Sequence, residues 1–325
     1  MIQAARAALI ALDWGTSSLR AYRLDAQGNV VDARHLPWGI MRLPETDPGD
    51  AGASLHARFE IAFEAACGDW LRQQPGLAVI ACGMVGSAQG WREAPYLDVP
   101  AGLPDIGSTL TRVDRGQGTP LHIVPGLLQG GALPNVMRGE ETQIAGIVAG
   151  LPSHQTPDLL VCLPGTHSKW VRVTGQRIAH FDTFMTGEVY AALREHTILG
   201  RTMRDGQGED AQAFAQGLAV AGTPEGRAGV LSTIFSTRTL GLAGRLPATG
   251  QADYLSGLLI GHEVTSLLAM RAPAQATLVL CGQASLCARY EQALAYYGVR
   301  DVVHAPQATE RGLWLIARGA GLLAE

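Results

Sequence analysis

Two short turns rich in glycine and hydroxyl side chains could bind an anion. The first turn, Gly15–Ser18, follows Asp13 at the end of an apolar run, and the second, Gly165–Ser168, lies 150 residues later. A glycine turn presents backbone N–H groups without a Cβ in the way, and such concavities bind phosphate above all. One turn of this kind is also typical of a plain β-hairpin, so the phosphate interpretation depends on finding two.

The segments around both turns predict a repeated set of elements. Periodicity in the first half predicts strands at 8–13, 18–25 and 29–36, a helix at 53–73, and strands at 77–84 and 121–124. The second half repeats this with strand-like runs at 159–162 and 169–173, a strand at 176–183, helices at 187–199 and 251–270, a strand at 277–282, a helix at 284–297, a strand at 301–305 and a helix at 309–323. The chain is therefore predicted to be a duplicated α/β fold, with the order β-β-β-α-β-α-β in each half.

Facing halves of a duplicated fold would direct both turns into one cleft, and a triphosphate is the natural ligand there. A bound triphosphate also needs a metal ion to neutralise its charge. Asp13 fits the metal role, through coordinated water, because magnesium keeps much of its hydration. The alternative for Asp13 is a turn-capping aspartate.

Composition narrows the class of protein. The 325 residues exceed the usual size of a single core, so two lobes are expected, and the 47% hydrophobic content is that of a folded chain. A net charge of -4 argues against nucleic acid and anionic membranes as partners. The five cysteines lack metal-ligand spacing and are expected to be reduced and buried. No leader or membrane span is predicted, so a cytoplasmic protein is expected; the oligomeric state stays open.

Several motifs together resemble a known family. The two turns look like the phosphate loops of the actin, hexokinase and Hsp70 superfamily. The chain more closely resembles the 2-dehydro-3-deoxygalactonokinase family, in order over roughly 8–320, through the segments DWGTSSLRA, GMVGSAQGW, APY, NVMRGEETQ, PGTHSKW, TGE and YLSGLLIGHE.

The resemblance implies an ATP-dependent, Mg²⁺-dependent kinase that phosphorylates the C6 hydroxyl of 2-dehydro-3-deoxy-D-galactonate in galactonate catabolism. The implied fold is two ribonuclease H-like lobes around an ATP cleft. Residues 1–135 would form the lobe with the first phosphate loop and the sugar-acid site, with helix 308–325 packing back on it. Residues 136–307 would form the lobe with the second phosphate loop and the adenosine site.

ATP contacts are expected from the two turns and from the turn after strand 277–282. Arg20 pairs with phosphate or simply lies on the strand surface, and Lys169 could approach the γ-phosphate as a point charge. The expected ATP-binding residues are Gly15, Thr16, Ser17, Ser18, Arg20, Gly165, Thr166, His167, Ser168, Lys169, Gly282 and Gln283.

A catalytic base is expected at a helix start, where the dipole favours an anion. Glu141, followed by Gln143, best fits the position of the catalytic acid in related sugar kinases, and Glu140 is the alternative. Both glutamates could instead serve only as caps of that helix.

The sugar acid needs donors for its carboxylate and polar groups for its hydroxyls. The irregular stretch after strand 77–84 is the expected wall, although Trp91 could equally be core and Arg138 could equally lie on the surface. The expected substrate residues are Ser87, Trp91, Glu93, Tyr96 and Arg138.

Two alternatives remain. A related sugar acid such as 2-dehydro-3-deoxy-gluconate could be the acceptor, because one inverted hydroxyl is read by one or two contacts. An actin- or Hsp70-type ATPase is the alternative from another class, although 325 residues leave little room for partner-binding insertions.

Overall fold

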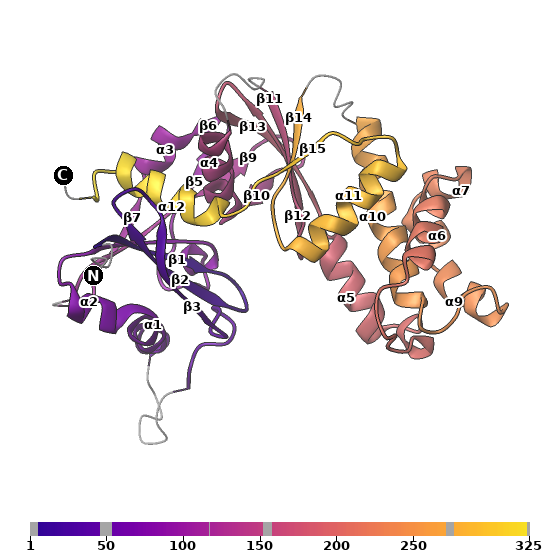
Figure 1. Ribbon diagram of the computed structural model, residues 1–325, viewed down its shortest axis with the longest axis horizontal. Helices are drawn as coiled ribbons and strands as arrows, with labels where there is room; N and C mark the ends of the chain where they lie inside the picture. The colour runs from indigo at the N-terminus through magenta and orange to yellow at the C-terminus, as the bar shows by residue number, and fades with distance from the viewer. Residues whose placement is uncertain (1–5, 46–53, 117, 152–157, 271–275, 324–325) are drawn as a thin grey trace, which may run out of the picture. The chain divides into compact units, whose positions relative to one another are not determined.

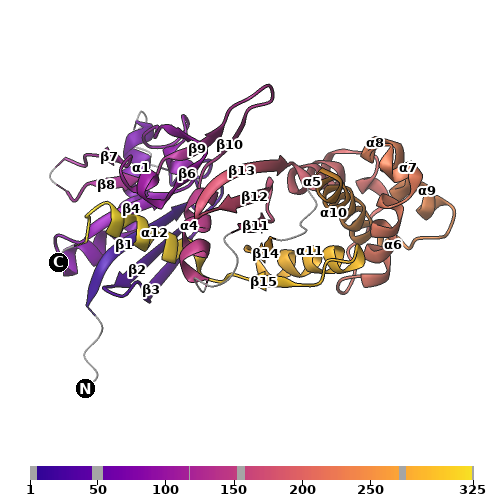
Figure 2. The same ribbon diagram turned by 90° about the horizontal axis from the view of Figure 1, so that it is seen from above.

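The computed structural model describes residues 6–45, 54–116, 118–151, 158–270 and 276–323 (Figures 1 and 2). Contacts divide the chain into two compact units. Unit 1 comprises 1–157, 173–181 and 305–325, and unit 2 comprises 158–172 and 182–304.

The first six-stranded sheet has the order β3-β2-β1-β4-β8-β7. β1 runs antiparallel to β2 and parallel to β4. The bounds are β1 (Ala7–Trp14), β2 (Leu19–Asp25), β3 (Val30–Leu36), β4 (Ala78–Cys82), β7 (Thr111–Val113) and β8 (Leu121–Ile123).

Helices pack on one side of this sheet (Figure 1). They form one helical segment made of α1 (Leu55–Phe63), a π-helical turn (Glu64–Gly68) and α2 (Asp69–Gln73). Their side chains Phe59, Phe63 and Trp70 are buried in the same cluster as the alternating apolar residues of β1 and β4. The amphipathic spacing that predicted a single helix here therefore forms a continuous helical segment with one wider turn.

The second six-stranded sheet repeats the order of the first. Its order is β15-β14-β11-β12-β13-β6. Five strands of the two sheets therefore correspond, with β3-β2-β1-β4-β8 in the first sheet matching β13-β12-β11-β14-β15 in the second. β11 is parallel to β14, and β14 to β15. The bounds are β6 (Ala101–Gly102), β11 (Asp158–Leu163), β12 (Ser168–Thr174), β13 (Arg177–Phe184), β14 (Thr277–Leu280) and β15 (Val302–His304). The predicted duplication of a ribonuclease H-like α/β fold is confirmed.

Unit 1 also contains a short sheet and three helices whose positions matter for the site. The sheet has the order β10-β9-β5, with β5 (Tyr96–Asp98), β9 (Gly126–Gln129) and β10 (Asn135–Met137). The helices are α3 (Leu103–Gly107), α4 (Glu140–Gly150) and α12 (Ala308–Gly319).

Helices α4 and α12 pack backbone to backbone, side by side in Figure 2. A Cβ on Gly146 would lie 1.9 Å from the Ala308 carbonyl oxygen, and one on Gly312 would lie 1.9 Å from that of Thr142. Only glycine allows so close an approach. This packing groups α4 with unit 1, so the change of unit falls at 157/158 and differs from the boundary expected at 135/136.

Unit 2 carries a helical layer beside its strands (Figure 1). Its α-helices are α5 (Thr186–His196), α6 (Ala211–Ala221), α7 (Pro224–Arg227), α8 (Val230–Thr233), α9 (Ser236–Leu242), α10 (Gln251–Met270) and α11 (Ala284–Tyr296). Helices α6 to α9 lie in the stretch from 200 to 250, for which no element was predicted, and they pack on or near α10.

The five cysteines are free and buried, as expected. Among the described residues, helices that combine the length and the apolar character of a membrane span are absent.

Candidate active site

Asp13 stands at the carboxyl end of β1, in the middle of the first sheet. The strand register places it opposite Arg20 on β2 and Cys82 on β4. Arg20 Nη1 lies 3.1 Å from Asp13 Oδ2, with the Asp13 side chain 23% exposed. Burial raises the pKa of Asp13, and Arg20 opposes that rise. β1 therefore places the Asp13 carboxylate at the end of the sheet where the parallel strands β1 and β4 finish, and Arg20 bonds to that carboxylate directly.

The Gly15–Ser18 turn is held by backbone hydrogen bonds. The N–H of Gly15 donates to Ser18 O at 3.0 Å, and the N–H of Ile40 donates to Gly15 O at 3.0 Å. Thr16 and Ser17 are exposed. Within the part of the chain that the structure describes, no acceptor is paired with the N–H groups of Thr16, Ser17 or Ser18. The turn therefore presents unused donors, as a phosphate loop must.

Each turn is braced by a glycine that follows the third strand of its own sheet. A Cβ on Gly39, after β3, would lie 2.2 Å from the Thr16 carbonyl oxygen. A Cβ on Gly187, after β13, would lie 2.4 Å from the Gly165 carbonyl oxygen. The duplication therefore extends beyond the strands to the way in which each turn is supported.

The brace predicts the result of a single substitution. Gly39→Ala should displace the first turn and raise the KM for ATP roughly 10- to 100-fold, because an ångström of misplacement disrupts positioned contacts. Steady-state kinetics with varied ATP measure this. Gly130→Ala is the matched control, since a Cβ there meets nothing within 4 Å. An unchanged KM in Gly39→Ala would show that the position of the turn does not matter for ATP.

Glu141 is the second residue of α4 and lies near the end of β4. A Cβ on Gly139 would lie 3.2 Å from Gly83 Cα, so the backbone before α4 touches the residue that follows β4. Asp13 and Glu141 both act electrostatically on Cys82, whose pKa is raised mainly by burial. Both carboxylates therefore belong to one region of unit 1, at the carboxyl ends of β1 and β4.

The Glu141 carboxylate is fully buried at the helix start. It accepts hydrogen bonds from the Gly139 N–H at 2.7 Å and the Thr142 hydroxyl at 3.0 Å. Burial, assisted by the charge on Glu140, raises the pKa of Glu141 to about 7. Glu140 is only partly buried and accepts from the Arg138 N–H at 3.0 Å. A glutamate whose pKa lies near neutrality is suited to act as a general base.

Arg138 is a buried cation with unused donors. The residue is 9% exposed, its Nη2 donates to Ala94 O at 2.9 Å, and its guanidinium lies 4.3 Å from the centre of the Tyr96 ring. Nε and Nη1 have no partner among the described residues, and neither does the hydroxyl of Ser87, which is 6% exposed. Buried donors without acceptors are costly, so these atoms are suited to bind an acceptor on a ligand or water.

The other expected substrate residues differ in setting. Trp91 is 8% exposed, stacks on Phe59 and donates its indole N–H to His56 at 2.8 Å. It therefore belongs to the aromatic core rather than to an open wall. Glu93 and Tyr96 are exposed.

The second turn differs from the first in what surrounds its last residues. Thr166 and His167 are exposed, and His167 Nε2 lies 2.5 Å from Glu188 Oε2. Ser168 is fully buried and bonded to the Tyr290 hydroxyl at 2.7 Å. Lys169 is 5% exposed and donates to the Thr183 hydroxyl at 2.7 Å. Ser168 and Lys169 therefore support the turn from inside unit 2.

Gly282 and Gln283 are exposed at the end of β14, and Gln283 precedes α11. A Cβ on Gly282 would lie 3.3 Å from Pro164 O, so this turn lies beside the second glycine turn. A cavity of about 250 Å³ joins Gly165 to α11 within unit 2; its other lining residues are Thr186, Gly187, Tyr190, Ser256, Leu259, Ile260, Leu286, Arg289 and Tyr290.

Most of these cavity residues were absent from the sequence interpretation. They come from three different helices, and no local motif marks Leu286 or Arg289. Two quoted segments gave a signal: TGE contains Thr186 and Gly187, and YLSGLLIGHE contains Ser256, Leu259 and Ile260.

A metal would have to be held mainly by Asp13. Among the described residues no group of three or more His, Cys, Asp or Glu side chains gathers as a metal site. One carboxylate fits magnesium, which binds through one or two carboxylates and takes further ligands from phosphates and water.

Comparisons with known proteins agree on one family. The model of the 2-keto-3-deoxy-galactonokinase family matches residues 13–316. The chain is 37% identical over 291 residues to the 2-dehydro-3-deoxygalactonokinase of Escherichia coli K12, covering 89% of this chain and 90% of that one. It is 36% identical over 315 residues to a Rhizobium meliloti protein assigned as 2-dehydro-3-deoxygalactonokinase DgoK1, covering 95% and 96%.

Solved structures give the same result. The crystal structure of a Sinorhizobium meliloti protein, also assigned as a 2-dehydro-3-deoxygalactonokinase, superposes with a TM-score of 0.81 at 34% identity, over 95% of this chain and 98% of that one. Component A of the (R)-2-hydroxyglutaryl-CoA dehydratase of Acidaminococcus fermentans, at 10% identity and a TM-score of 0.50, covers 98% of this chain and 97% of that one and shares the fold alone.

The duplicated fold and the family match define a kinase, an enzyme that transfers phosphate to an alcohol. Within that class, the chain belongs to the 2-keto-3-deoxy-galactonokinase family. Use of ATP follows from membership of a kinase family, and the alternative of an actin- or Hsp70-type ATPase is set aside.

Proposed function

We propose that this chain transfers the γ-phosphate of ATP to the C6 hydroxyl of 2-dehydro-3-deoxy-D-galactonate, in the cytoplasm and with Mg²⁺. The observation that carries the proposal is that Asp13 and Glu141 lie in one region of unit 1, near the ends of β1 and β4, and that the turn after Asp13 has unused N–H donors. The names of the relatives supply the acceptor.

The residues of unit 1 would act as follows. The Gly15–Ser18 turn binds phosphate oxygens through its N–H groups and exposed hydroxyls. Asp13 would hold Mg²⁺, and the ion would neutralise charge on the phosphates. Glu141 accepts the proton of the C6 hydroxyl as its oxygen attacks phosphorus, and the remainder of the nucleotide leaves as ADP.

Unit 2 would supply the rest of the nucleotide contacts. The Gly165–His167 turn binds phosphate, and the cavity beside α11, with Gly282 and Gln283 at its edge, takes the adenosine. The apolar and aromatic lining of this cavity supports that choice.

A coupled assay for ADP release tests the proposal. ATP consumption should be slow without an acceptor and rise strongly with 2-dehydro-3-deoxy-D-galactonate, which should also have a higher kcat/KM than the gluconate epimer. Phosphorus NMR of the product should place the phosphate on C6. A higher kcat/KM for the gluconate epimer would make that epimer the preferred substrate. ATP turnover that does not depend on the acceptor would contradict the kinase role of this site.

Arg138 should recognise the substrate carboxylate. Arg138→Met should raise the KM for the sugar acid about 10- to 100-fold, because hydrogen bonds to a charged partner are lost, and leave the KM for ATP nearly unchanged. Both constants come from initial rates with one substrate varied at a time.

Arg115→Met is the matched control. The Arg115 guanidinium is also buried and stacked, 3.5 Å from the centre of the Phe63 ring, but it is paired with Glu60 and Glu64. It should lower stability without changing either KM. Equal KM values for the sugar acid in Arg138→Met and wild type would remove Arg138 from the substrate site.

A further inference from the structure

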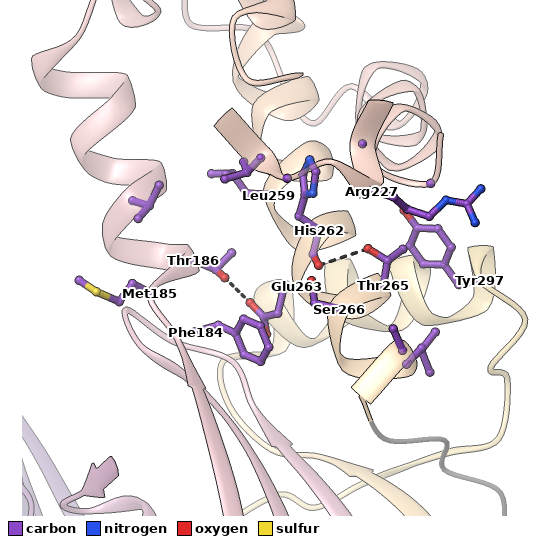
Figure 3. Close-up of a pocket in the computed structure, with 17 residues that line it drawn as sticks. Phe184, Met185, Thr186, Arg227, Leu259, His262, Glu263, Thr265, Ser266 and Tyr297 are labelled. Atoms are coloured by element: carbon purple, nitrogen blue, oxygen red, sulfur yellow. Dashed lines mark hydrogen bonds between the residues drawn. The ribbon is translucent and has the colours of Figure 1, made fainter. Parts of the chain in front are cut away.

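Glu263, on α10 in unit 2, is a buried carboxylate with no part in the proposed reaction. The residue is 2% exposed and lies at the wall of a cavity of about 680 Å³, where Figure 3 shows its side chain turned toward Thr186. Burial raises the pKa of Glu263, and hydrogen bonds to the carboxylate oppose the rise.

Three donors from three different elements converge on this carboxylate. The indole N–H of Trp170, on β12, donates to Oε1 at 2.7 Å. The hydroxyl of Tyr290, on α11, donates to Oε2 at 2.8 Å, and the hydroxyl of Thr186, at the start of α5, donates to the same oxygen. All three partners belong to unit 2.

Each donor is adjacent to part of the second glycine turn. Trp170 lies two residues after Ser168, and Ser168 itself bonds to the Tyr290 hydroxyl. Thr186 precedes Gly187, whose backbone contacts Gly165, and the N–H of Glu188 donates to Thr166 O at 2.9 Å. Glu263 therefore connects the strand that leaves the turn, the segment that braces it and the helix that lines the adjoining cavity.

We propose that Glu263 is a positioning residue that fixes the second glycine turn in its nucleotide-binding shape. This inference rests on the proposed function, in which that turn binds phosphate of ATP. Glu263 does not touch the nucleotide and acts through Trp170, Tyr290 and Thr186.

Three variants and a control separate positioning from general stability. Glu263→Leu removes the acceptor of all three donors. Glu263→Gln can accept from Trp170 and donate to both hydroxyls, which are free to rotate. Thr186→Val removes the bond between Glu263 and the bracing segment, and it also changes one residue of the cavity beside α11. Tyr297→Phe, the matched control, removes a half-buried tyrosine hydrogen bond to Leu218 O at 2.6 Å, which joins the residue after α11 to α6 rather than to the turn.

The readout is ADP affinity by calorimetry, with the melting temperature measured in parallel. Glu263→Leu should weaken ADP binding roughly 10- to 100-fold and Thr186→Val about tenfold, given the strength of hydrogen bonds to charged groups. Glu263→Gln should stay within about threefold of wild type, because the amide restores the network. Tyr297→Phe should lower the melting temperature and leave ADP affinity unchanged.

The possible outcomes are distinct. Unchanged ADP affinity in Glu263→Leu and Thr186→Val, with a lower melting temperature, would overturn the proposal and leave Glu263 a purely structural residue. If Glu263→Leu does not fold, Thr186→Val decides. Wild-type protein that fails to bind ADP would instead contradict the proposed function itself. The assay contains no sugar acid, so the identity of the acceptor has no influence on it.

Discussion

Glu141→Gln should lower kcat by about 10²-fold or more while ADP binds with unchanged affinity, since a positioned base contributes that much to proton transfer. An amide cannot take the proton of the attacking hydroxyl, whereas its size and helix-start position stay the same. The Gly139 N–H can still donate to the amide oxygen, so the start of α4 should persist. Single-turnover rates and ADP calorimetry measure the two effects separately.

Glu140→Gln is the matched control for this experiment. Its partner is a backbone N–H of the same helix start, that of Arg138, and its charge is among the causes that raise the pKa of Glu141. Removing that charge should lower the pKa of Glu141 and shift the acid side of the pH profile downward, with kcat largely kept. A large loss of kcat in Glu140→Gln with normal turnover in Glu141→Gln would transfer the role of base to Glu140.

The pH dependence follows from the same group. The pKa of Glu141 is raised to about 7, so the carboxylate is the minority form below that pH. A base must be deprotonated, and wild-type kcat should therefore fall as the pH drops through 7, with a slope of one proton. A rate that stays flat down to pH 5 would show that the base titrates elsewhere.

Asp13→Asn should reduce kcat by about 10²- to 10³-fold, in the range seen when one electrostatic contact to a transition state is lost. The amide keeps the shape and can still hydrogen-bond, but it lacks the charge that holds the hydrated ion beside the phosphates. The KM for Mg²⁺ should rise at the same time, and part of the lost rate should return at high Mg²⁺. Kinetics with varied Mg²⁺ at saturating ATP measure this.

Asp25→Asn provides the comparison for Asp13. Asp25 also ends a strand of the first sheet and is 8% exposed, but it caps a turn by accepting from Gln27 and Asn29. These bonds lower its pKa, so its substitution should cost stability. The KM for Mg²⁺ should not change. A Mg²⁺ response in Asp13→Asn equal to that of Asp25→Asn would end the assignment of the metal to Asp13.

The elements that position the turns were predictable because their signals are local. The run that ends at Asp13 and the alternation that follows Gly15 need no knowledge of the rest of the chain to indicate two strands and a tight turn. The same applies to β14 and α11, whose buried run and helical spacing meet at Gly282 and Gln283. The 150-residue repeat then predicted that both halves share one succession of strands and helices, whereas the strand order within each sheet comes from the structure.

The surroundings of the site depend on contacts between distant segments and could not be predicted in the same way. Ser168 and Lys169 occupy positions after a glycine turn that suit phosphate binding, yet β12 directs them toward Tyr290 and Thr183. Trp91 lies in a turn-rich loop, yet three aromatic neighbours enclose it. The grouping of α4 with unit 1 depends on the close backbone contacts of Gly146 and Gly312, which lie 166 residues apart in the chain and share no local pattern.

For Arg138 the structure distinguishes between two roles that the sequence left open. From the sequence, a carboxylate-binding role and a surface role were equally compatible with its position before two glutamates. Its burial and its unused Nε and Nη1 atoms argue against the surface role. The carboxylate-binding role stays a prediction.

The contact of α4 with α12 also bears on biosynthesis. Helix α4, which begins at Glu140, is translated well before residues 308–319, against which its Gly146 packs. Domains otherwise tend to fold in order as they leave the ribosome. Here unit 1 cannot complete its packing before α12 has been synthesised. A prematurely terminated polypeptide would therefore carry both proposed phosphate turns but lack the helix that packs against α4, which bears the proposed base.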